Sequence, residues 1–171
     1  MKNLIKLNKE MKYAITGHTR GIGEAIYHKL SPNIIGFSRT NGYDINDPDS
    51  RARIIAEIQD CDVFINNAVS ERGRGQVLIF QELYNLWKDL DKKIINVGSA
   101  ISEVTLKPGD SRTMYRNVEV SLKWRTQRVQ GLGRFKVEYK YFSYVSTPTQ
   151  LIKNPNAKFI SIEEAVNIIL S

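Results

Sequence analysis

The sequence is poor in the residues that crosslink a chain or bind metal ions. It contains one cysteine, Cys61, so no intramolecular disulfide can form, and its two histidines, His18 and His28, belong to no metal-binding motif. No apolar run approaches the roughly 20 residues of a membrane-spanning helix, and residues 1–10 lack the apolar core of a signal peptide. We therefore expect a cytoplasmic protein with no membrane segment and no metal site.

Acidic residues are also scarce relative to basic ones, because 18 Asp and Glu stand against 25 Lys and Arg, a formal net charge of +7. This excess has four interpretations: a solvated basic face, or a nucleic acid, an anionic surface or an anionic cofactor as the partner. The basic residues concentrate between Arg112 and Lys136, without the aromatic signature of an RNA-recognition module or a helix-turn-helix pattern. We therefore do not expect a nucleic-acid partner.

Glycines mark the most informative stretch of the chain. The short apolar run 13–15 breaks into a turn that carries Gly17, Gly21 and Gly23, and a helical pattern follows to Leu30. Glycine lets the backbone approach phosphate groups closely, and the N-terminus of the helix offers unpaired N–H groups. The stretch predicts a dinucleotide-binding turn, although an ordinary glycine-rich turn between a strand and a helix is the alternative.

Strand and helix patterns alternate along the rest of the chain, which predicts an α/β fold. We expect a three-layer, Rossmann-type, doubly wound parallel sheet of about six strands. The expected strands after the first are 33–38, which we expect to be buried on both faces, 62–65, 93–97 and 135–145. The expected helices after the first are 47–59, 76–90, 112–130 and 161–170. Residues 1–10 are a flexible leader in this interpretation, and 11–171 form one NAD(P)-binding Rossmann domain.

Two arginines indicate which dinucleotide the turn binds. Arg39 follows Ser38 at the end of the second expected strand, where a carboxylate selects NAD and an arginine accommodates the 2′-phosphate of NADP. Arg20, inside the glycine turn, is a second cation that can reach the same phosphate. We therefore expect NADP(H) as the cofactor; two unrelated surface arginines are the alternative.

The motif T-G-x-x-x-G-I-G at 16–23, together with N-N-A at 66–68, resembles the short-chain dehydrogenase/reductase (SDR) family. The resemblance implies that Asp44 and Ile45 hold the adenine ring and that the N-N-A segment lines the adenosine side; Asp44 is equally plausible as a turn residue. Val69 replaces the last glycine of the family's N-N-A-G. The cofactor residues implied are Gly17, Thr19, Arg20, Gly21, Ile22, Gly23, Ser38, Arg39, Asp44, Ile45, Asn67 and Ala68.

The catalytic pattern of the family is incomplete. By resemblance, Ser99 polarises a substrate carbonyl and Tyr115 donates the proton. The family's lysine four residues after the tyrosine is replaced by Glu119, whose charge would oppose a phenolate, and the assisting asparagine is absent. Arg112 and Arg116 are expected on other faces of the helix. The resemblance favours an NADP-dependent oxidoreductase on a carbonyl or alcohol substrate, and a non-catalytic NADP(H)-binding sensor or accessory protein stays open.

The helix expected over 76–90 carries two apolar stripes. One contains Val77, Phe80, Tyr84 and Trp87, and the other contains Ile79, Leu83, Leu86 and Leu90. A helix that is apolar on two sides is buried on two sides. In the resembled family the corresponding helix packs on the sheet and on a partner subunit, so we expect a homodimer or a higher homo-oligomer. A helix covered only by its own chain is the alternative.

Overall fold

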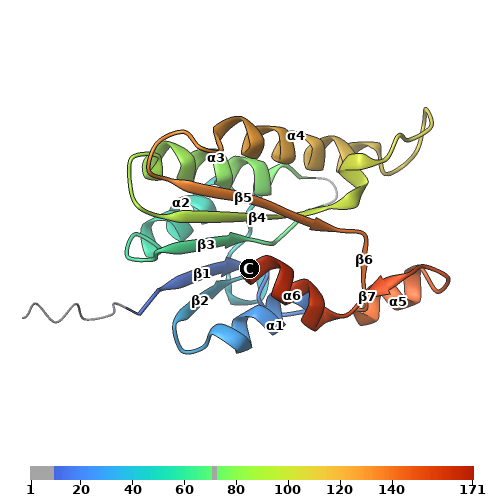
Figure 1. Cartoon of the computed structure of the whole chain (residues 1–171), viewed down its shortest axis with the longest axis horizontal. Helices are drawn as coiled ribbons and strands as arrows, with labels where there is room; N and C mark the ends of the chain where they lie inside the picture. Colours follow the sequence, from blue (N-terminus) through green and yellow to red (C-terminus); the bar gives the residue numbers. More distant parts are fainter. Residues whose placement is uncertain (1–9, 71–72) are drawn as a thin grey trace, which may run out of the picture.

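A parallel sheet of five strands forms the centre of the molecule (Figure 1). The structure, a computed structural model, describes residues 10–70 and 73–171. The strand order is β2-β1-β3-β4-β5, and every pair of neighbours is parallel. The strands are β1 (Tyr13–Thr16), β2 (Ile34–Phe37), β3 (Val63–Asn66), β4 (Lys93–Ser99) and β5 (Lys136–Phe142). The chain builds outward from β1 in one direction and then in the other, so the carboxyl ends of β1 and β3 flank a crevice where ligands bind in open α/β sheets.

Helices cover both faces of this sheet, so the expected three-layer, doubly wound fold is confirmed (Figure 1). One face packs against α1 (Gly21–Leu30) and α6 (Ile162–Leu170). The other packs against α2 (Pro48–Glu57), α3 (Gly75–Trp87) and α4 (Thr113–Val129). Each layer encloses its own apolar cluster, because the buried strands present side chains to both faces.

The chain after β5 departs from the predicted single strand over 135–145. It breaks at Ser143, and the small strand β6 (Tyr144–Val145) pairs with β7 (Phe159–Ile160) outside the central sheet. A short helix that the sequence interpretation did not include, α5 (Pro148–Lys153), lies between them, with Thr147 as its N-cap. The central sheet therefore has five strands where about six were expected, and the β6–α5–β7 segment forms a wall beside its carboxyl edge.

The burial of β2 differs from the expectation, and part of the burial expected for α3 is found within the chain. Strand β2 was expected to be buried on both faces, yet Ile35 is 44% exposed, because β2 lies at the edge of the described sheet and pairs there with β1 on one side. In α3, Ile79 and Leu83 of the second stripe are fully buried within the chain itself. The other two residues of that stripe, Leu86 and Leu90, are exposed, at 54% and 43%, so half of the stripe is covered without a partner subunit.

A buried polar network ties the sheet to the helices on one face. The Nδ2 group of Asn66 donates to Oδ1 of Asn96 at 2.8 Å, and Nδ2 of Asn96 donates to Oγ1 of Thr126 in α4 at 2.9 Å. Gln76 in α3 donates to the carbonyls of Asn66 and Val97, at 2.9 and 2.7 Å. These bonds fix the ends of β3 and β4 against α3 and α4, which positions the edge where the candidate site lies.

Residues 1–9 of the predicted leader lie outside the described residues. Of the helices that the structure describes, none has the length and apolar character to cross a membrane.

Candidate functional site

The glycine turn folds tightly between β1 and α1. Gly17 and Gly21 have positive φ angles of 76° and 57°, which side-chain-bearing residues rarely adopt. Gly23 has no such angle, but a Cβ built on it would lie 2.0 Å from the carbonyl oxygen of Gly17. Close backbone contact therefore requires glycine at position 23. The first residues of α1, Gly21 to Gly23, line the groove, and the N-terminus of a helix has unpaired N–H groups.

Hydrogen bonds lock this turn to the end of β3. Oγ1 of the buried Thr16 accepts from the N–H groups of Asn67 and Ala68, at 3.1 and 3.0 Å. In return, Nδ2 of Asn67 donates to the carbonyls of Thr16 and Gly17, at 3.1 and 3.3 Å. The threonine that opens the first motif and the asparagine of the second thus form one unit. The two motifs identified from the sequence include both residues, but the sequence did not predict that Thr16 and Asn67 contact each other.

The first of three adjoining pockets, which we call the adenosine pocket, has a volume of about 1090 Å³. Arg20 and Arg39 both line it and are exposed, and neither makes an ion pair with any residue of 10–70 or 73–171. Oδ1 of Asp44 accepts from the N–H of Asn46 at 2.9 Å, so this carboxylate stabilises a turn. Asp44 also lines the pocket. The pocket is lined by Gly17, Thr19, Arg20, Phe37, Ser38, Arg39, Thr40, Tyr43, Asp44, Ile45, Asn46, Asn67, Ala68, Val69 and Ser70.

A buried arginine that was not identified from the sequence, Arg51, contacts the loop that lines one side of this pocket. Arg51 in α2 is 5% exposed and donates from Nη1 to the carbonyl of Ile45 at 2.9 Å. Its Nε contacts both carboxylate oxygens of Glu82 in α3 at 3.1 Å. This bridge fixes the loop that presents Asp44 and Ile45. Arg51 follows an ordinary helix start in the sequence, so no local signal marked it.

The second pocket, of about 830 Å³, extends the groove past the start of α1. It shares Arg20 and Asn67 with the adenosine pocket, and it reaches Ser99 and Tyr115 at its other end. Its lining includes the start of α1, at Gly21 to Gly23, and part of the C-terminal segment, at Phe142, Ser143, Val145, Thr147, Pro148, Thr149 and Gln150. The pocket therefore connects the phosphate-binding turn with the expected catalytic residues.

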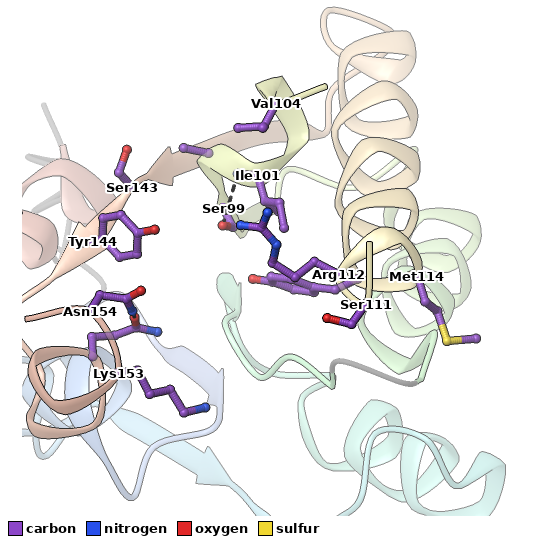
Figure 2. Close-up of a pocket in the computed structure, with 13 residues that line it drawn as sticks. Ser99, Ile101, Val104, Ser111, Arg112, Met114, Ser143, Tyr144, Lys153 and Asn154 are labelled. Atoms are coloured by element: carbon purple, nitrogen blue, oxygen red, sulfur yellow. Dashed lines mark hydrogen bonds between the residues drawn. The ribbon is translucent and has the colours of Figure 1, made fainter. Parts of the chain in front are cut away.

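The third pocket has a volume of about 900 Å³ and opens between two walls (Figure 2). We call it the substrate pocket after the roles expected for Ser99 and Tyr115, which both line it. The start of α4 and the 3-10 turn η2 (Ala100–Glu103) form one wall, and β6 with α5 forms the other. Ser99 caps η2, and its Oγ accepts from the N–H of Ile101 at 3.3 Å. The lining residues are Ser99, Ala100, Ile101, Val104, Ser111, Arg112, Met114, Tyr115, Ser143, Tyr144, Gln150, Lys153 and Asn154.

The surroundings of Tyr115 differ from the expectation for the helix that carries it. Arg112, expected on another face, lines the same pocket as Tyr115, because residues three apart lie on one side of a helix. Its guanidinium pairs with Asp110 at 2.8 Å, and these hydrogen bonds lower the pKa of that carboxyl to about 2. Arg116 does turn away, since its Nε donates to the carbonyl of Val104.

Glu119, expected beside Tyr115 in place of the lysine, lines none of these pockets and is 1% exposed. Its Oε2 accepts from the N–H of Ser99 at 3.0 Å and from the hydroxyl of Tyr139 at 3.2 Å. Burial raises the pKa of Glu119 to about 7, against the opposing effect of these two hydrogen bonds. The carboxyl group therefore supports Ser99 from the core side rather than facing the pocket.

Every site residue named from the sequence lines one of the three pockets, and the groove they form runs along the carboxyl ends of β2, β1, β3 and β4. The residues expected to hold the cofactor all line the adenosine pocket or the second pocket, and Ser99 and Tyr115 line the second and the substrate pocket. Sequence reasoning missed Arg51, Lys153 and Tyr144, and it misplaced Arg112.

No known protein family profile and no curated protein matches the sequence. Solved structures do match the fold. A short-chain dehydrogenase from Burkholderia cenocepacia in complex with NADP is 18% identical, with a TM-score of 0.74 over 94% of this chain and 82% of that one. A short-chain dehydrogenase/reductase from Caenorhabditis elegans with cofactor is 16% identical, with a TM-score of 0.72 over 93% and 86%. A small-chain dehydrogenase in complex with NADPH is 15% identical, with a TM-score of 0.70 over 94% and 89%. The chain therefore has the Rossmann-type fold of the short-chain dehydrogenases/reductases.

Proposed function

We propose that this chain is an NADP(H)-binding member of the short-chain dehydrogenase/reductase family and acts as an oxidoreductase on a carbonyl or alcohol substrate. One observation carries the proposal: a single groove has Arg20 and Arg39 at one end and Ser99 with Tyr115 at the other. The order of these groups along the groove is the order that a dinucleotide requires when its adenosine carries a 2′-phosphate and its other end meets a substrate.

The residues present fit this cofactor. The turn at Gly17, Gly21 and Gly23 leaves backbone room that a side chain would fill, and the N-terminus of α1 suits a pyrophosphate. Arg20 and Arg39 supply two guanidinium groups for a phosphate dianion beside the adenosine pocket. Structures of similar fold are in complex with NADP or NADPH, which supports the same choice here.

At the substrate end, the chemistry that NADP(H) supplies when bound is hydride transfer to or from the reacting carbon. Oγ of Ser99 already accepts from the N–H of Ile101, so its hydroxyl hydrogen is available to a substrate oxygen. The Tyr115 hydroxyl gives a proton to that oxygen during carbonyl reduction and removes it during alcohol oxidation. Both side chains line the pocket that connects the phosphate turn with the substrate pocket.

A non-catalytic NADP(H)-binding sensor or accessory protein is the second candidate. Position 119, where the resembled family has its lysine, holds a buried carboxyl group that lines none of the three pockets. The proposed proton donor therefore has no cation from that position. In this alternative the groove binds the cofactor and turnover is absent.

Exchange of Arg39 for Asp tests the cofactor proposal. We expect the affinity for NADPH to fall by roughly 100-fold or more, because one charge-assisted contact is lost and a like charge is added, while NADH affinity does not fall. Fluorescence titration and the rise in Tm with each nucleotide measure both affinities. Arg134→Asp, an exposed change outside the pockets, is the matched control. Equal loss of both nucleotides would refute the assignment, and failure of both to stabilise the parent chain would refute cofactor binding altogether.

The proposal also includes residues 11–171 as one NAD(P)-binding domain, a cytoplasmic location and a homodimer. Two exposed leucines support the dimer: Leu86 in the last turn of α3, and Leu90, three residues beyond its end. If they form the contact, replacing both with Glu should convert the dimer to monomer in light-scattering chromatography without changing NADPH affinity. A parent chain that is already monomeric would exclude the dimer.

A further inference from the structure

The charges that line the substrate pocket are of one sign. Arg112 and Lys153 line it, and among residues 10–70 and 73–171 its lining includes no Asp or Glu. Neither cation lines the adenosine pocket or the second pocket. The cofactor proposed above, with its phosphates near Arg20 and Arg39, therefore does not account for them. They are available to a second ligand in the substrate pocket.

Arg112 is held in position before any ligand binds. Its Nε donates to Oδ1 of Asp110 at 3.0 Å, and its Nη2 donates to Oδ2 at 2.8 Å. A guanidinium has five N–H groups, so Nη1 and one hydrogen of Nη2 still have donor capacity after this pairing. Asp110 does not itself line the pocket. It fixes the guanidinium, whose remaining donors form a rigid fork that suits an oxyanion.

Lys153 approaches from the opposite wall, at the end of α5 (Figure 2). Within 10–70 and 73–171, no ion pair engages its ammonium. With Asp110 offsetting the charge of Arg112, Lys153 gives the pocket its net positive charge. An exposed lysine at a helix end is often only solvated. This one differs because it lines the same pocket as Arg112, a cation from a segment about 40 residues earlier in the chain.

The rest of the lining divides into polar and apolar parts. Hydroxyl and amide groups that can donate to an oxyanion come from Ser111, Ser143, Tyr144 and Asn154, whereas Ile101, Val104 and Met114 offer apolar surface. Such a pocket suits a molecule with a hydrocarbon part and one charged end.

We propose that the substrate is a carbonyl compound, or the corresponding alcohol, that carries an oxyanion group, bound between Arg112 and Lys153 while its reacting oxygen faces Ser99. This inference rests on the proposed oxidoreductase function and specifies its substrate class. A carboxylate and a phosphate share the recognising chemistry, because both present oxygens to an arginine fork and an ammonium. The apolar lining favours the carboxylate.

Two matched pairs of probes test the inference by binding. Phenylpyruvate is compared with its methyl ester, and dihydroxyacetone phosphate with dihydroxyacetone, by calorimetry on the protein with and without NADPH. We expect at least one anionic probe to bind about tenfold more tightly than its neutral partner, as expected for a hydrogen bond to a charged group. The first pair responds if the group is a carboxylate, and the second responds if it is a phosphate.

Lys153→Gln should reduce the affinity for the anionic probe about tenfold and leave the neutral probe and NADPH unchanged. Lys158→Gln, an exposed lysine outside the pockets, is the matched control and should change nothing. Equal affinities within both pairs, no binding of either anion at millimolar concentration, or equal effects of the two lysine variants would overturn the inference. A protein that selects the anion yet binds no NADPH would refute the cofactor proposal alone, and the reverse result would refute only the substrate class.

Discussion

The two ends of the groove are built in different ways. At the adenosine end, a turn of consecutive residues is closed by backbone geometry and by the hydrogen bonds between Thr16 and Asn67. At the substrate end, the lining comes from β4, η2, α4, β6 and α5, and few of its side chains bond to one another. The first end depends on close backbone approach, and the second depends on how separate segments converge.

Because of this difference, we expect the two ends of the groove to tolerate amino-acid substitutions to different degrees. A local turn fixed by glycines leaves little room for substitution, because a Cβ meets backbone that cannot move. A wall made by a six-residue helix and a two-residue strand accepts new side chains without disturbing the sheet. We therefore expect that the proposed cofactor binding and the proposed substrate binding can be lost separately, and variants at the two ends test this.

The largest expected effect is at the substrate end. Tyr115→Phe removes the proposed proton donor and should lower the rate of any carbonyl reduction by about 10²- to 10⁴-fold, the range of general acid catalysis. NADPH affinity should stay within about twofold, because the residues expected to contact phosphate and adenosine are unchanged. Single-turnover oxidation of NADPH and fluorescence titration measure the two quantities. A variant that reduces substrates at the parent rate would remove Tyr115 from the mechanism.

The next effect is at the other end. Gly23→Ala places a Cβ 2.0 Å from the carbonyl oxygen of Gly17, so we expect a loss of about 3 kcal/mol in unfolding free energy together with loss of NADPH binding. Gly109→Ala is the control, since that glycine has a φ of 81° but nothing within 4 Å of the added Cβ. It should cost about 1 kcal/mol from backbone strain alone. Equal destabilisation of the two variants in urea would show that the close contact at Gly23 is relaxed.

The adenosine end was predictable from the sequence because its determinants are local. Glycine spacing, the strand end at Arg39 and the Asn67–Ala68 pair each indicate a function through short-range geometry, and all of them line the groove. The layered fold was predictable for a similar reason, since buried parallel strands and amphipathic helices have distinct periods. The prediction of burial was wrong at the edge of the sheet. Ile35 is exposed because β2 is an edge strand, and the order of the strands cannot be read from local sequence.

The substrate end was predictable only in Ser99 and Tyr115. The break at Ser143 has no strong local signal in the sequence. After it, β6 and α5 form a wall of the pocket, which is how Lys153 comes to line the same pocket as Arg112. Glu119 was misread because its spacing from Tyr115 implied a common face toward the cofactor, whereas its carboxyl accepts from the N–H of Ser99 inside the core. A lysine there would lose that acceptor role, so Glu119→Lys should destabilise the chain rather than restore activity.

The smallest effect, and the one that depends on pH, concerns Glu119. Its pKa is raised from 4.5 to about 7, so the folded chain binds more protons than the unfolded chain between these values. Stability therefore falls as pH rises from about 4.5 to about 7 and stays lower above it, by at most about 3 kcal/mol.

Glu119→Gln has no proton to lose, and its amide oxygen can still accept from the N–H of Ser99. It should match the parent chain near pH 4.5 and exceed its unfolding free energy by up to about 3 kcal/mol at pH 8, as measured by urea denaturation. Glu163→Gln, on the exposed side of α6, should show no such divergence. If the unfolding free energies of the parent and of Glu119→Gln changed with pH in parallel, the carboxyl group of Glu119 would ionise as it does in water. The N–H of Ser99 would then donate to a charged carboxylate at neutral pH.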